Sequence, residues 1–126
     1  RGAVMPTITM RVRGSSELRR NLNRLHGAER RQAQRDGLEA GARVVETWAK
    51  VLCPIDTGTL RNSIMVDEVT PERALIAPHT DYAEHVEFGT SRMAAQPYMR
   101  PALDQHEGEI LAAVEATVRD FVESIR

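Results

Sequence analysis

The chain has 126 residues, of which 41% are hydrophobic and 28% charged, and its formal net charge at pH 7 is −1. This length predicts a single domain over residues 1–126 that can bury a core. No apolar run approaches the roughly 18 residues of a membrane helix, so we expect no membrane contact. One cysteine, Cys53, excludes an internal disulfide framework. We expect residues 1–5 to be a disordered or vector-derived start.

Charge is distributed unevenly along the chain. Residues 1–35 carry nine arginines and two acids, a local net charge of +7, whereas residues 36–126 carry a local −8. If one helix continues through Gly27, four arginines fall on the face opposite its leucines. These arginines are Arg20, Arg24, Arg31 and Arg35. Such a face suits a protein interface or non-specific contact with the phosphates of double-stranded DNA, and a solvated surface is the plainer alternative.

The N-terminal half predicts a strand followed by helices. Apolar and polar residues alternate over 7–13, which is typical of a half-buried strand. Ser15 offers an N-cap for a helix from about Ser16 to Leu25. The leucine phase does not continue past Gly37, so we expect a break or kink between Gly27 and Gly37. A second helix is then predicted up to residue 52, where Pro54 ends it.

The middle of the chain predicts a hairpin after a structured loop. Thr59 is expected to cap a short helical turn over 60–62. Two strands are predicted over 63–69 and 73–77, joined by Thr70-Pro71-Glu72.

The C-terminal part predicts mainly helix. Residues 81–90 are expected to form a turn or short helix ending at Gly89, and 91–96 a mobile loop. Pro97 and Pro101 are expected to hold 98–100 extended, with Pro101 beginning one long last helix. The whole order predicts an α+β domain in which a small antiparallel sheet packs against two N-terminal helices and a long C-terminal helix.

No residue set predicts catalysis. Cys53 lies in the last turn of a predicted helix, where the dipole disfavours a thiolate, so we expect a core residue. The acids and histidines of segment 79–87 lack the His-Glu-x-x-His spacing of zinc enzymes, and a solvated polar loop is the simpler interpretation. Segment 56–59 lacks the lysine of a phosphate-binding loop. We therefore predict a protein that is not an enzyme and that uses neither metal nor cofactor.

Three motifs nevertheless follow one another in a fixed order. The first runs from Ala49 to Ile64 and contains Pro54-Ile55-Asp56-Thr57-Gly58-Thr59-Leu60-Arg61. The second is Tyr82-Ala83-Glu84-His85-Val86-Glu87-Phe88-Gly89-Thr90, and the third is Gln96-Pro97-Tyr98-Met99-Arg100-Pro101-Ala102-Leu103. Together they resemble the small tail-completion or head–tail joining proteins of tailed bacteriophages, the lambda gpZ-like and HK-type minor tail proteins of the neck.

This resemblance implies a virion structural protein of a phage, prophage or gene transfer agent. It would assemble in the host cytoplasm into a homo-oligomeric ring, expected to be a hexamer, in the neck. Its partners would be the head connector or stopper and the tail terminator or tail-tube proteins, with DNA passing through the ring. A tail terminator or stopper subunit, a small DNA-binding regulator that uses the arginines, and a hydrolase or metal enzyme around 79–87 are the alternatives.

The resemblance also suggests roles for individual residues. We expect segment 56–58 to build a rigid loop, with Glu87 and Thr90 as acceptors nearby. Either Arg61 or Arg100 could pair with Glu87, and maintenance of the fold alone is the competing role. The basic first helix and the acidic last helix are expected to meet, within one chain or between neighbouring copies.

Overall fold

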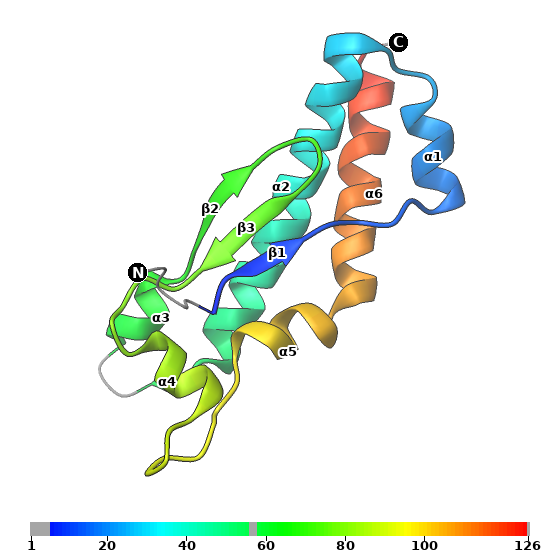
Figure 1. The fold of residues 1–126 in the computed structure, drawn as a ribbon. Helices are drawn as coiled ribbons and strands as arrows, with labels where there is room; N and C mark the ends of the chain where they lie inside the picture. The colour runs from blue at the N-terminus through cyan, green and yellow to red at the C-terminus, as the bar shows by residue number, and fades with distance from the viewer. Residues whose placement is uncertain (1–5, 56–57, 126) are drawn as a thin grey trace.

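A computed structural model describes residues 6–55 and 58–125 of the chain (Figure 1). Within these ranges the elements are, in chain order, β1 (Ile8–Met10), α1 (Ser16–Leu22), α2 (Gly27–Leu52), α3 (Thr59–Ser63), β2 (Met65–Val69), β3 (Ala74–Ala77), α4 (Ala83–Phe88), α5 (Met99–Asp104) and α6 (Glu107–Ser124). The α+β class predicted from the sequence is confirmed.

The three strands form an antiparallel sheet in the order β1-β3-β2. The β2–β3 hairpin is confirmed, and its turn closes with the Thr70 N–H donating to the Arg73 carbonyl at 2.8 Å. β1 is shorter than the alternation predicted. Met10 pairs with Ala74, the first residue of β3, so residues 11–13 have no partner on β3.

α2 and α6 lie side by side, and the sheet covers α2 (Figure 1). The predicted break between Gly27 and Gly37 is wrong, because α2 is continuous from Gly27 to Leu52. Gly37 and Gly41 are buried where α6 approaches closely. A Cβ at Gly41 would lie 3.0 Å from Val114 Cγ2. These glycines therefore serve helix–helix packing, and the turn occurs earlier, over residues 23–26.

α1 ends at Leu22, three residues before the predicted end. Its start is confirmed, since the Ser15 hydroxyl accepts a hydrogen bond from the Leu18 N–H at 3.1 Å. α1 packs on α6 rather than on the sheet, with Leu18 in a small core shared with α6. The ion pair between Arg119 and Glu17, at 2.9 Å, joins the same two helices. The first and last helices thus meet within one chain. In the ion pair that joins them, α6 supplies the basic residue and α1 the acidic one.

The predicted long last helix is two helices, α5 and α6, with a break at residues 105–106. The extended form expected for 98–100 is also wrong, because Met99 and Arg100 are helical. Pro101 is tolerated there, since the first turn of a helix does not need its missing N–H. At the break, the His106 ring stacks on Trp48 of α2, with centroids 3.9 Å apart.

The main core lies between the sheet and α2, with contributions from α3, α4 and α5. None of the helices in the described part of the chain is both long and apolar enough to cross a bilayer.

Candidate functional site

The first motif connects α2 to α3. Gly58 occupies the N-cap position of α3 with φ at +85°, and Leu60 is buried beneath it. The prediction that Thr59 caps this helix is wrong, because Thr59 is its first residue. Arg61 is exposed. Asp56 and Thr57, expected to form a rigid loop, lie outside the described residues.

The second motif forms α4 and the turn that follows it. Ala83 and Glu87 face the core, whereas Phe88 is 61% exposed. Gly89 ends the helix with φ at +77°, as predicted. Thr90 then closes a tight turn, in which its N–H donates to the Met93 carbonyl at 2.8 Å.

Glu87 joins the second motif to the third. Glu87 as a whole residue is 4% exposed. Oε1 accepts hydrogen bonds from the backbone N–H groups of Tyr98 and Met99, both at 2.9 Å. Oε2 accepts one from the Arg100 N–H at 3.0 Å. These donors belong to the first turn of α5, where the helix leaves N–H groups unsatisfied and favours negative charge.

The expected ion pair between Glu87 and an arginine side chain is therefore not formed among the described residues. The Arg100 guanidinium instead lies 3.6 Å from Asp104, one turn along α5. The idea that Glu87 acts as an acceptor was right, but its donors are backbone groups of the third motif. Pro97 precedes these donors and Pro101 follows them.

Two titratable side chains are buried in the same region. Tyr98 is fully buried and its hydroxyl donates to the Ala83 carbonyl at 3.2 Å, and burial raises the pKa of this phenol. Burial also raises the pKa of the Cys53 thiol, against the weaker lowering effect of Arg61. Cys53 is thus the core residue that the sequence predicted, in an environment that favours the unreactive thiol.

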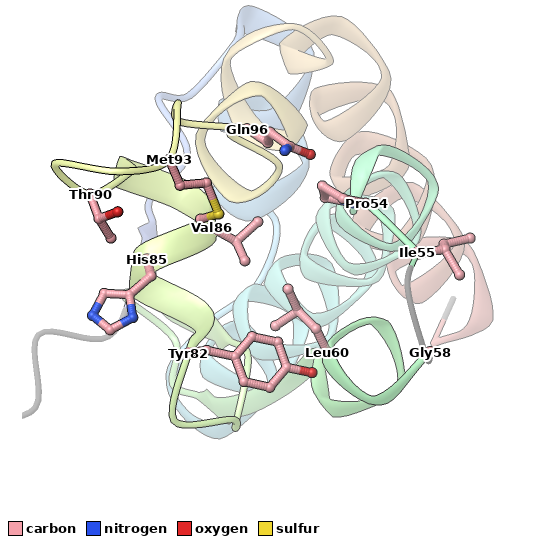
Figure 2. Close-up of a pocket in the computed structure, with 10 residues that line it drawn as sticks. All are labelled: Pro54, Ile55, Gly58, Leu60, Tyr82, His85, Val86, Thr90, Met93 and Gln96. Carbon is pink, nitrogen blue, oxygen red and sulfur yellow. The ribbon is translucent and has the colours of Figure 1, made fainter.

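The three motifs meet around one cleft of about 510 Å³ (Figure 2). Figure 2 shows Val86 and Met93 on one side and Pro54 and Leu60 on the other. The complete lining is Pro54, Ile55, Gly58, Leu60, Tyr82, His85, Val86, Thr90, Met93 and Gln96. Most of these side chains are apolar, so the cleft is suited to receive an apolar side chain.

The histidines and acids of 79–87 do not converge. The His79 ring contacts Asp67 of β2 at 2.8 Å, whereas His85 lies at the outer margin of the cleft (Figure 2). Across residues 6–55 and 58–125, no group of three or more His, Cys, Asp and Glu could hold a metal ion.

The four arginines singled out by the sequence do not share one helix. Arg20 lies on α1, Arg24 in the following turn, and Arg31 and Arg35 on α2. All four are exposed, and Arg31 lies 3.6 Å from Glu72 of the hairpin turn. The single helix on which their alignment depended is interrupted at residues 23–26.

A family model described as "Bacteriophage HK97-gp10, putative tail-component" matches residues 16–89. The chain belongs to this HK97-gp10-like family. The match spans α1 to α4, including the first motif and the second as far as Gly89, and it ends before the third motif. Membership gives the protein the role of a structural tail component of a bacteriophage, and hence a place in the virion. No curated protein and no solved structure matches the chain.

The sequence placed His85 and Val86 in the second motif, but it did not predict that they line a cleft together with Met93 in this tail component. One signal could have found part of the set. Tyr82, His85 and Val86 are spaced i, i+3 and i+4, which puts them on one face of α4. No comparable signal exists for Met93, because the turn at Thr90 decides its position.

Proposed function

We propose that this tail component works in the neck of a tailed phage, as a gpZ-like subunit that forms one domain. In this role it forms a homo-oligomeric ring, expected to be a hexamer, that joins the head connector to the tail tube and lets DNA pass. Family membership supports the structural role. The resemblance of the three motifs to tail-completion proteins supports the position in the neck.

The observation that carries the proposal is the gathering of exposed apolar side chains where the motifs meet. Seven large apolar side chains are exposed among the described residues. Five of them lie in or beside the segments that form the cleft: Val51, Ile55, Tyr82, Phe88 and Met93. Such a group on a soluble protein marks an interaction site. An adjoining head or tail protein would cover it in the assembled neck.

The arginines support a second contact. Arg20 and Arg24 lie near the end of the α2–α6 pair that is farthest from α3 and α4 (Figure 1). Neither forms an ion pair with a described residue. They are available for non-specific contact with DNA passing through the ring. A free DNA-binding regulator remains the alternative, which a salt-resistant, sequence-dependent gel shift would favour.

The test is to count this protein in purified particles by quantitative mass spectrometry against the major tail-tube protein. We expect a low, fixed copy number, and we expect deletion of its gene to leave filled heads and unjoined tails. A terminator or stopper subunit gives the same count, so labelling in electron micrographs must locate the layer. Absence from intact particles would refute the proposal.

A variant then tests the cleft end. Phe88→Ser should lower incorporation into particles about tenfold while leaving thermal stability unchanged. Ile125→Ser is the matched control, because Ile125 is also exposed, at 43%, and lies at the far end of α6. Equal incorporation of the two variants would show that the cleft end is not a contact surface.

A further inference from the structure

The sheet has two open edges on opposite sides. β3 is central, so β1 and β2 each have one side without a partner strand among the described residues. Open edges are templates for strand pairing. Since the two edges are different surfaces of the same chain, a contact between β1 of one copy and β2 of the next is head-to-tail. Repetition of such a contact closes a ring when the rotation permits.

The β1 edge borders a groove of about 620 Å³. One wall is the segment from Thr9 to Arg13, and the other is formed by α5 and the start of α6. Leu103, Ile110 and Leu111 supply an apolar floor, and Leu103 and Leu111 are only half-buried. In Figure 1 the sheet lies over α2 and leaves α6 beside it. A further strand beside β1 would cover this floor.

The two edges carry opposite charge. Arg11 and Arg13 are exposed on the β1 side, where Glu107 of α6 also lines the groove, so the charged lining of the groove has a net charge of +1. Neither arginine forms an ion pair or hydrogen bond with a described residue. On the other edge, β2 presents Asp67, which contacts the His79 ring at 2.8 Å, and Glu68, and the hairpin over residues 65–77 has a formal net charge of −2. Glu68 lies 3.6 Å from Arg73, and both are substantially exposed. A basic edge and an acidic edge on one molecule complement each other between copies.

A bulge limits how much ladder β2 can add. The register of β2 against β3 shifts between Val66 and Glu68. Bulges twist a strand and shorten the stretch that can pair. We therefore expect attraction between the opposite charges and burial of the apolar groove floor to contribute more to this contact than backbone hydrogen bonds do. Because β1 and β2 are both antiparallel to β3, a sheet continued by rotation pairs them in parallel.

We propose that the β1 groove of one copy receives the β2 edge of a second copy, with Arg11 and Arg13 facing Asp67 and Glu68. This rests on the proposed ring and names the two surfaces that build it. The cleft end then stays free for a different virion protein.

Charge reversal tests the pairing. Either double variant, Arg11→Glu/Arg13→Glu or Asp67→Lys/Glu68→Lys, should weaken self-association about tenfold or more, measured by light scattering on a sizing column. A mixture of the two variants restores opposite charges at every contact, so assembly should return, in rings with an even number of subunits. The control Asp120→Lys/Glu123→Lys makes the same charge change as the β2 variant, at exposed residues of α6 away from both edges, and should assemble normally.

A crosslink provides a measurement that does not depend on charge. Arg11→Cys together with Glu68→Cys should give a ladder of disulfide-linked oligomers under mild oxidation, while Cys53 is buried. Either single variant should give at most a dimer.

The outcomes separate this inference from the proposed function. Normal assembly of each double variant alone, failure of the mixture to recover, or no ladder overturns the edge pairing. A native protein that is monomeric in solution, together with no ladder from the double-cysteine variant in particles, overturns it as well. The copy number in particles is measured separately from the edge pairing. If the count is low and fixed but the pairing tests fail, the proposed neck role still stands.

Discussion

Replacing Glu87 by Gln should destabilise the protein by about 2–3 kcal/mol. The carboxylate accepts three backbone N–H groups of residues 98–100, and Glu87 as a whole residue is 4% exposed. Glutamine can still accept the two bonds on one oxygen, but its NH2 group would face the Arg100 N–H, donor against donor. One charge-assisted bond, worth about 1.5–3 kcal/mol, is lost and the other two weaken. Glu87→Ala leaves all three donors unpaired and should cost more.

Urea unfolding measures this effect as a lower midpoint with an unchanged slope. For a chain of this length, 2–3 kcal/mol corresponds to a melting temperature lower by about 10 °C. Glu123→Gln is the matched control, because Glu123 is exposed on α6 and should change stability by less than about 0.5 kcal/mol. If Glu87→Gln unfolds like the control, the capping role assigned to Glu87 is refuted.

Three further outcomes follow from local geometry. Gly89→Ala should lower the free energy of unfolding by about 3 kcal/mol or more, because φ is +77° and a Cβ would lie 2.8 Å from the Ala95 nitrogen. Gly108→Ala is the control: a Cβ there meets nothing within 4 Å, so the same melts should show a gain of about 0.5–1 kcal/mol. The Cys53 thiol, buried and with a raised pKa, should react with a thiol reagent only as fast as the protein unfolds; full labelling of the native protein would contradict its burial. The raised pKa of Tyr98 means that the unfolded chain ionises first, so stability is complete below about pH 10 and then falls by about 1.4 kcal/mol per pH unit. Tyr98→Phe should remove this contribution to the fall in stability at alkaline pH. If the fall is unchanged in the variant, other groups cause it.

Local patterns predicted the elements well where the interactions that decide them are short in sequence. Alternation predicted β1, the Ser15 cap predicted the start of α1, and turn residues predicted the hairpin. The positive φ of Gly89 ended α4 at the predicted residue. Each of these depends on residues within a few positions of one another.

The same reasoning failed where a distant partner decides the backbone. The loss of the leucine phase predicted a break between Gly27 and Gly37, yet Gly37 lies inside α2, where its missing side chain lets α6 approach. The two prolines around 98–100 predicted an extended segment, but the carboxylate of Glu87 satisfies the N–H groups of a helix start there. Neither partner is visible from the neighbouring sequence.

The sequence alone determined the α+β class, most of the order of the elements and the motifs that resemble those of phage tail proteins, because amphipathic spacing, caps and turns act within about one helical turn. The tertiary structure decided how those motifs are used. It brought segments 54–60, 82–90 and 96–100 together, turned Glu87 into a cap for a helix eleven residues away, and left a cleft between them. It also set a basic edge and an acidic edge on opposite sides of one sheet. Such contacts depend on how whole elements pack, which no local spacing encodes.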